Sequence, residues 1–290
     1  MQKPKRAKAP VHFPGWPQII DVVRSQIRAQ ISTGALVQGN SLEVMDALAA
    51  HFPDGCFDCI FADPPYFLSN GGITCHAGKM VKVDKGAWDK SQGAELNHEF
   101  NTEWLKRCQR VLKPNGTIWV TGTSHVVFSV GYAMQQLRMK ILNDITWEKP
   151  NPPPNLSCRY FTHSTETVLW AAKNAASKHV FNYKLMREHA GGKQMKSVWR
   201  IKSPALAEKQ FGKHPTQKPL ALVERCLLAS THAGDIVMDP FAGGGTTMAA
   251  SIRTKRHGLG IELEPRYVET AVRRMEQAAG LDQLPLTART

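Results

Sequence analysis

Residues 235–263 read D-I-V-M-D-P-F-A-G-G-G-T-T-M-A-A-S-I-R-T-K-R-H-G-L-G-I-E-L, and this stretch decides the fold. The apolar segment Asp235–Asp239 predicts a buried strand, Thr246–Thr254 predicts a helix, and Gly258–Leu263 predicts a second strand. A glycine-rich turn joins the first strand to the helix. Strands that alternate with helices in this way form a mostly parallel sheet with helices on both faces.

The same alternation extends toward the N-terminus. Segments rich in β-branched and aromatic residues predict four further strands: Phe57–Ala62, Thr117–Thr121, Ile141–Trp147 and Thr165–Ala171. Apolar residues at helical spacing predict helices over Glu99–Leu112 and about 265–279. Segments 67–98 and 171–213 show no clear period and predict long loops. We therefore expect an α/β fold with a basic, loop-rich insertion.

Composition and charge narrow the function classes. The 290 residues are 42% hydrophobic and 21% charged, which excludes a mainly disordered or fibrous chain. Lys and Arg number 37 against 24 Asp and Glu, so the net charge is +13. Residues 171–218 alone hold eleven basic and two acidic side chains. Such a concentration of positive charge predicts a polyanionic partner such as nucleic acid.

Six cysteines without a secretory leader predict reduced thiols in a cytoplasmic protein. Cys56 and Cys59 form the one C-x-x-C pair, and no second pair follows at zinc-site spacing, so no metal site is expected. The longest uncharged run, 114–137, is broken by glycine and polar residues, so no membrane span is expected.

The glycine-rich turn at Gly243, Gly244 and Gly245 lies where parallel α/β sheets bind ligands, after the carboxyl end of a strand. No G-K-[ST] follows, and Met248 stands where a dinucleotide motif would have its third glycine. The turn therefore suits an amino-acid-like or adenosyl ligand. Glu262, at the end of the next strand, is placed to accept hydrogen bonds from ribose hydroxyls.

A second candidate site, Asp63-Pro64-Pro65-Tyr66, follows the strand Phe57–Ala62. Two prolines fix the backbone, so the Asp63 carboxylate and the Pro64 carbonyl can accept hydrogen bonds from one planar amino group. Tyr66 and Phe67 offer aromatic faces on which a base can stack. This combination is suited to holding an aromatic amine.

Together these motifs resemble the beta class of amino-directed DNA methyltransferases, which use S-adenosylmethionine. D-P-P-Y at 63–66 precedes D-P-F-A-G-G-G-T-T at 239–247, as in that class. The match continues in H-P-T-Q-K-P at 214–219, and stretches 67–72 and 145–170 look closest to the DpnA and MboII-type adenine methylases. The resemblance covers about residues 36–275.

The resemblance implies a Rossmann-like methyltransferase fold in four parts: a basic N-terminal arm (1–31), a catalytic half (32–170), a target-recognition segment (171–212) and a cofactor-binding half (213–290). It assigns catalysis to Asp63, Pro64, Pro65 and Tyr66. The family commonly has Asp where Asn40 stands. The residues implied for S-adenosylmethionine binding are Asn40, Asp63, His214, Thr216, Gln217, Lys218, Asp239, Pro240, Phe241, Ala242, Gly243, Gly245, Thr246, Thr247 and Glu262.

The implied activity is methylation of a flipped-out adenine at N6 within a specific DNA site, as part of a restriction–modification system. We expect Tyr66 to stack on the base while Asp63 and the Pro64 carbonyl hold its amino group, whose nitrogen attacks the sulfonium methyl in line. The partners implied are DNA, a second copy of the chain in a homodimer, and a cognate restriction endonuclease acting at the same site. Candidate DNA contacts are Lys193, Lys196 and Arg200.

Other activities stay open at this point. Cytosine-N4 methylation uses the same chemistry on another exocyclic amine, although Asp63, where serine is commoner in the cytosine group, favours adenine. A catalytically silent DNA-binding relative would keep the fold, but the intact Asp63, Tyr66 and glycine turn weigh against it. Methylation of RNA or of a protein glutamine by a related P-P-Y site is a further alternative, and the basic segment weighs against it.

Overall fold

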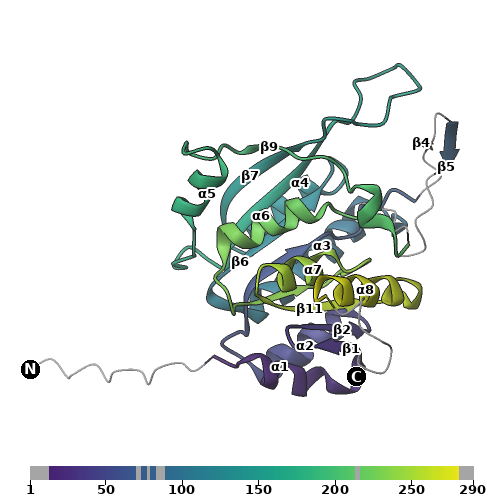
Figure 1. Ribbon diagram of the computed structural model, residues 1–290. Coiled ribbons are helices and arrows are strands. Elements are labelled where there is room, and N and C mark those ends of the chain that lie inside the picture. Colours follow the sequence, from purple (N-terminus) through teal and green to yellow (C-terminus); the bar gives the residue numbers. More distant parts are fainter. Residues whose placement is uncertain (1–12, 70–72, 77–78, 83–88, 213–215, 281–290) are drawn as a thin grey trace, which may run out of the picture.

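The computed structural model describes residues 13–69, 73–76, 79–82, 89–212 and 216–280 (Figure 1). Their centre is a nine-stranded sheet with the order β1-β2-β11-β10-β3-β6-β8-β7-β9. The strands are β1 (Ile27–Ile31), β2 (Gly34–Gln38), β3 (Phe57–Ala62), β6 (Leu112–Gly122), β7 (Lys140–Glu148), β8 (Thr165–Ala172), β9 (Val198–Arg200), β10 (Ile236–Asp239) and β11 (His257–Glu262).

The five central strands β2, β11, β10, β3 and β6 are all parallel. β1 pairs antiparallel with β2 at one edge, and β8 runs antiparallel between β6 and β7. The predicted mostly parallel α/β sheet is therefore confirmed. Parallel strands place all their carboxyl ends at one edge of the sheet, and this edge carries the site described below.

Helices cover both faces of the sheet, as predicted, and Figure 1 shows α6, α7 and α8 across one of them. Side chains of β3 alternate between the two faces: Ile60 packs with the first four helices, whereas Cys59 and Phe61 pack with α6. The helices are α1 (Trp16–Val23), α2 (Ser41–His51), α3 (Ala94–Val111), α4 (Val127–Gln136), α5 (Tyr183–His189), α6 (Leu220–Ser230), α7 (Thr246–Arg253) and α8 (Pro265–Ala278), with short 3-10 turns η1 (Arg24–Gln26) and η3 (Leu206–Lys209).

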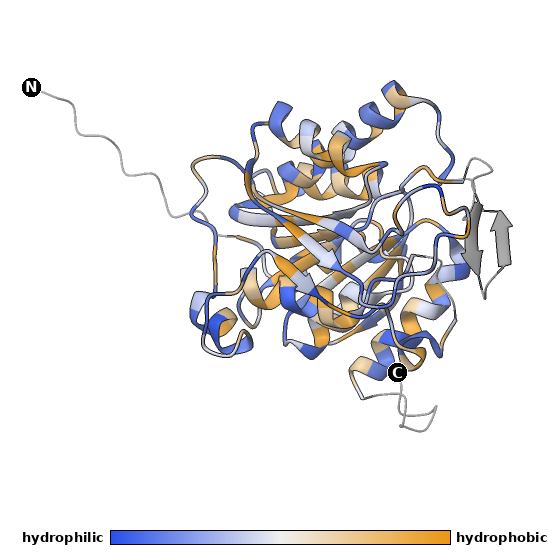
Figure 2. Ribbon diagram, turned by 90° about the horizontal axis from the view of Figure 1, so that it is seen from above, coloured by the Kyte–Doolittle hydropathy of each residue, from blue (hydrophilic) through white to orange (hydrophobic). Residues whose placement is uncertain are grey.

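Apolar residues concentrate in the strands and on the inner sides of the helices, as Figure 2 shows from above. The core includes the stacked indoles of Trp119 and Trp170, whose centroids are 4.6 Å apart. Cys59 is fully buried, and burial raises the pKa of its thiol to about 12. The Cys59 thiol is therefore part of the hydrophobic core. Within the part of the chain that the structure describes, every helix is too short or too polar to span a lipid bilayer.

The predicted element boundaries differ from the observed ones mainly at strand β6, which begins at Leu112 and not at Thr117, and at helix α3. This helix begins at Ala94, five residues before the predicted start, and ends at Val111, where β6 follows directly. The segment predicted as a long loop after β3 carries a two-stranded hairpin, β4 (Ile73–His76) and β5 (Lys79–Lys82). Likewise, segment 171–212 contributes α5, η3 and the edge strand β9, so part of it belongs to the sheet.

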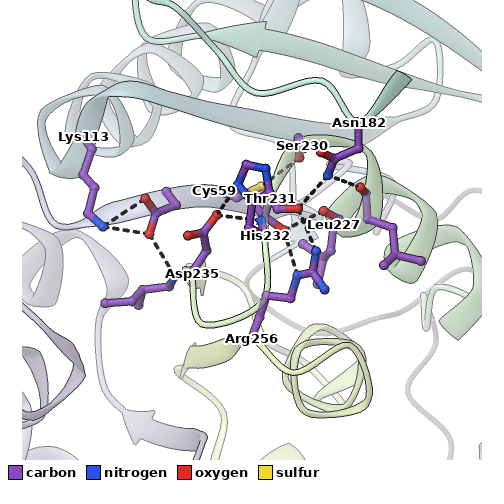
Figure 3. A network of polar contacts seen from close by, with 12 residues as sticks. Cys59, Lys113, Asn182, Leu227, Ser230, Thr231, His232, Asp235 and Arg256 are labelled. Carbon is purple, nitrogen blue, oxygen red and sulfur yellow. Dashed lines mark hydrogen bonds and ion pairs between the residues drawn. The ribbon is translucent and has the colours of Figure 1, made fainter. Parts of the chain in front are cut away.

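A buried polar network ties together the amino ends of β3 and β10 (Figure 3). Arg256 donates from Nε to Thr231 Oγ1 (3.0 Å) and from Nη2 to the Thr231 carbonyl (2.7 Å). Asn182 Nδ2 donates to the same carbonyl (2.8 Å). These contacts satisfy carbonyls at the C-terminus of α6 and therefore stabilise the fold. They lie at the opposite end of the strands from the candidate site.

Candidate active site

A cavity of about 290 Å³ opens at the carboxyl ends of β2, β3, β10 and β11. Eight of the residues expected to bind the cofactor or the target line it together, although five separate segments of the chain supply them. They are Asn40, Asp63, Pro65, Thr216, Pro240, Phe241, Gly243 and Glu262. A smaller hollow beside the cavity is lined in addition by Gln217, Lys218, Asp239, Ala242, Thr246 and Thr247.

Asp239 shapes the glycine-rich turn from within. Its Oδ1 accepts the Phe241 N–H (2.9 Å) and its Oδ2 accepts the Thr247 hydroxyl (2.5 Å). Burial raises the pKa of Asp239 to about 7. The side chain therefore links the end of β10 to the first turn of α7 across the glycines.

Gly245 allows the helix after the turn to lie against α8. Its φ is +82°, and a Cβ there would lie 2.8 Å from both Cα and Cβ of Ala271. Gly243 also has a positive φ, of 50°. Arg274 of α8 donates to the Gly244 carbonyl and clamps the turn from outside. Glycine is required here by both backbone conformation and close approach.

Glu262 connects β11 to the glycine turn. Its Oε2 accepts the Gly243 N–H and its Oε1 accepts the Glu264 N–H, each at 2.7 Å. Burial raises the pKa of the Glu262 carboxyl. Each oxygen has a second acceptor position, so the carboxylate can still receive hydroxyl donors from the cavity.

Asn40 caps helix α2 while lining the cavity. Its Oδ1 accepts the Leu42 N–H (2.9 Å), so the acceptor end of the amide serves the helix. Its Nδ2 is 3.4 Å from Glu43 Oε1. An Asp at this position could cap the helix in the same way.

Asp63 accepts hydrogen bonds at both of its oxygens. Oδ1 receives the hydroxyls of Tyr66 (2.8 Å) and Thr121 (2.6 Å), and Oδ2 receives the Lys218 ammonium (2.7 Å). A carboxylate offers about four acceptor positions, so these contacts leave one on Oδ2. That position can accept one N–H of an amino group.

Glu166, at the start of β8, lies near the same hydroxyl and ammonium groups as Asp63. Its Oε2 accepts the Tyr66 hydroxyl (3.2 Å) and lies 3.7 Å from Lys218 Nζ, and its Oε1 pairs with Lys149. Burial alone would raise the pKa of Glu166, but the ammonium groups of Lys218 and Lys149 hold it below its usual value. Two partly buried carboxylates and two ammonium groups thus compensate one another's charge.

The Tyr66 ring is only 5% exposed, and Lys218 Nζ lies 5.1 Å from its centroid. Burial and the carboxylates of Asp63 and Glu166 raise the pKa of its hydroxyl. The backbone around it is held by Asp89, whose buried carboxylate accepts the N–H groups of Tyr66 (2.9 Å) and Phe67 (2.8 Å). Stacking of a base on Tyr66 stays a prediction.

The residues of H-P-T-Q-K-P divide between different partners. Lys218 lies in the Asp63 cluster, and Gln217 Nε2 donates to the Glu208 carbonyl (2.8 Å). Thr216 lines the cavity. His214 lies outside the described residues.

The candidate DNA contacts lie around the edge strand β9. Lys193, Lys196 and Arg200 are all exposed, and Arg200 is 3.4 Å from Glu148. They line neither the cavity nor the Asp63 cluster. Their contact with DNA stays a prediction.

Sequence reasoning missed several residues at this site. Phe100, Leu263, Glu264 and Tyr267 line the cavity, and Glu166, Lys149 and Thr121 surround Asp63. Glu264 and Tyr267 could have been found because they directly follow β11, at the edge where ligands bind. Phe100 lies within the predicted helix Glu99–Leu112, where its apolar side chain indicates only packing. Among the described residues, no group of three or more His, Cys, Asp or Glu is arranged to hold a metal ion.

Residues 57–273 match the model of the N6_N4 family, described as DNA methylase. The chain belongs to this family. The methylase is 56% identical to the type II methyltransferase M2.DpnII of Streptococcus pneumoniae over 220 residues, which are 76% of this chain and 82% of that protein. It is 51% identical to M2.LlaDCHI of Lactococcus lactis subsp. cremoris over 245 residues, covering 84% and 90% of the two chains.

Solved structures agree with the fold of the methylase. The complex of M1.HpyAVI with SAM superimposes with a TM-score of 0.64 at 28% identity, covering 83% of this chain and 98% of that one. The cytosine-N4-specific PvuII DNA methyltransferase superimposes with a TM-score of 0.66 at 20% identity, covering 87% of this chain and 92% of that one. Thus one fold accommodates enzymes that are 20% to 28% identical to this chain.

Proposed function

We propose that this DNA methylase transfers a methyl group from S-adenosylmethionine to N6 of an adenine flipped out of DNA at a specific site. The observation that carries the proposal is that Asp63, with one acceptor position left, lies in the same cavity as the glycine turn. A base must leave the stack to reach such a site, at a cost of a few kcal/mol.

The residues of the cavity fit S-adenosylmethionine, which supplies a sulfonium-activated methyl group when bound. Glu262 offers acceptor positions for ribose hydroxyls, and Phe241 and Tyr267 offer apolar surface for an adenine ring. The volume, about 290 Å³, is near the lower end of the roughly 300–1,000 Å³ typical of small-molecule sites. Asn40 and Thr216 add polar groups at the rim.

In this proposal Asp63 and the Pro64 carbonyl each accept a hydrogen bond from one N–H of the target amino group. These two hydrogen bonds orient the group so that the nitrogen lone pair is no longer conjugated with the ring. Lys218 and Thr121 keep the Asp63 carboxylate in one orientation. Positioning of this kind supplies much of the rate of a two-substrate reaction. Tyr66 contributes by donating its hydroxyl to Asp63, and its ring is the aromatic face on which we expect the base to stack.

Methyl transfer from labelled S-adenosylmethionine to DNA, followed by mass analysis of the nucleosides, tests the proposal. N6-methyladenine as the product supports it, whereas N4-methylcytosine favours the second candidate, a cytosine-N4 enzyme like its structural neighbour PvuII methyltransferase. Asp63→Ala should abolish transfer while S-adenosylmethionine still binds. Substantial transfer by Asp63→Ala would show that the roles are assigned wrongly.

The relatives named as type II methyltransferases support a place for this enzyme in a restriction–modification system, with a cognate endonuclease cutting the same site. Sequencing methylated positions in DNA from cells that express the chain would give the recognition site. A homodimer remains part of the proposal, and light scattering of the purified chain tests it. The cytoplasm, where the DNA substrate lies, is the compartment we propose.

A further inference from the structure

The connection between β7 and β8, residues 149–164, leaves the sheet beside the candidate active site. The Lys149 N–H donates to the Ser164 carbonyl (2.8 Å) and closes its base. The Lys149 ammonium pairs with Glu166, which in turn accepts the Tyr66 hydroxyl. Figure 1 shows this connection extending beyond the end of the sheet. Its base is therefore part of the cluster that holds Asp63.

Internal hydrogen bonds give this connection a defined shape. Asn155 Nδ2 donates to the Tyr160 carbonyl (2.5 Å), Asn155 Oδ1 accepts the Ser157 N–H (3.1 Å), and the Thr162 hydroxyl donates to the Pro153 carbonyl (2.6 Å). Residues 152–154 are three consecutive prolines, which restrict the backbone further. A preformed loop loses little conformational entropy when it binds a partner.

The tip of the connection presents apolar side chains to solvent. Phe161 is 97% exposed and Tyr160 is 60% exposed. Aromatic side chains bury about 150–250 Å² each on binding, so such exposure indicates a contact surface. Residues 149–164 contain Lys149 and Arg159 but no acidic residue, which favours a negatively charged partner.

Phe161 is within reach of the target nucleotide. It precedes Glu166 by five residues, so at 3.3–3.6 Å per residue their Cα atoms are at most about 18 Å apart. A base that has flipped out leaves an unstacked gap in the duplex, and apolar side chains wedge into such gaps in other proteins that distort DNA.

We propose that Phe161 inserts into the DNA duplex beside the target and fills the space that the flipped base vacates. This inference rests on the proposed function, because it requires a flipped nucleotide in the Asp63 site. Phe161 then stabilises the extruded state without contacting the reacting atoms, and the connection 149–164 serves as a DNA-contact arm beside β7 and β8.

The test compares Phe161→Ala with Phe128→Ala, which removes an equally large side chain that is 75% exposed on α4. Each variant methylates two duplexes that contain the recognition site, one fully paired and one with an abasic position opposite the target. Flipping costs a few kcal/mol in paired DNA and less without a partner base. We therefore expect kcat/KM of Phe161→Ala to fall about ten-fold or more on paired DNA and far less on the abasic duplex.

Phe128→Ala should match the wild type on both duplexes, and Phe161→Trp should retain activity on paired DNA. Equal losses by Phe161→Ala on both duplexes, or no loss on paired DNA, would overturn the insertion of Phe161. If the wild type methylated neither duplex, the proposed function itself would fail, and the two failures are therefore distinguishable.

Discussion

The Lys218 ammonium lies 2.7 Å from Asp63 Oδ2, and the two residues are 155 positions apart in the chain. Lys218 is 5% exposed as a side chain and also lies 3.7 Å from Glu166. Although burial opposes its charge, the carboxylates of Asp63 and Glu166 raise the pKa of Lys218. The ammonium group thus occupies one acceptor position of the carboxylate that we propose holds the target amine.

Glu166 should act on methyl transfer as a positioning residue, through Tyr66 and Lys218. Glu166→Gln keeps its size but removes its charge, so Lys218 and Lys149 lose a shared partner. A displacement of about 1 Å can cost about 10²-fold in rate, and we expect a fall in kcat of up to this size. The affinity for S-adenosylmethionine, measured by calorimetry, should not change because Glu166 does not line the cavity.

Glu224→Gln is the matched control for Glu166→Gln. Glu224 is a half-buried carboxylate on α6, and it pairs with Arg253 at the end of α7 (2.6 Å). It should leave kcat unchanged. If Glu166→Gln behaved like this control, or lost cofactor affinity and kcat in parallel, the positioning role would be refuted.

Gly245→Ala should destabilise the protein through contact with α8 as well as through its backbone. The added Cβ would lie 2.8 Å from Ala271, and overpacking costs about 1–3 kcal/mol. Gly234→Ala is the control, because Gly234 has a similar φ of +85° but nothing within 4 Å of the added Cβ. Denaturant unfolding should show a larger loss for Gly245→Ala, and equal losses would contradict the close approach.

Asp239 should make the cofactor-free protein less stable as pH rises. Burial raises its folded pKa to about 7 from the ordinary value of 3.8, so the folded state binds its proton more tightly than the unfolded chain does. Its contribution to stability is therefore present below about pH 4 and lost as pH rises toward 7. Asp239→Asn removes this titration, so the difference in Tm between variant and wild type should grow over that range. A constant difference would refute the shift.

Charge reversal of Lys193, Lys196 and Arg200 to Glu should reduce the salt dependence of DNA binding. Each lost phosphate contact lowers the slope of log K against log salt by about 0.9. Fluorescence anisotropy at several salt concentrations measures this slope. Lys106→Glu, at an exposed position on α3, provides the control. If the triple variant had the wild-type slope, these three residues would not contact the DNA phosphates.

Six of the nine strands and the two motifs at the carboxyl edge of the sheet follow from local sequence patterns, whereas β1, β2 and β9 do not. Strand β3 matches its predicted bounds, Phe57–Ala62, and β10 differs from its prediction by one residue. Their apolar runs, the D-P-P-Y turn and the glycine turn are local patterns, which chain neighbours specify. The alternation of strands and helices then placed both motifs at one edge, because parallel strands end together.

Only the tertiary structure decided which distant side chains surround Asp63. Glu166 and Lys149 come from the β7–β8 pair, and Thr121 comes from β6. Strand pairing and register bring these residues to the end of β3. The periodicity of their own segments does not predict this proximity. The burial of Tyr66 beneath Lys218 has the same origin, because contacts between segments far apart in sequence depend on how the whole core packs.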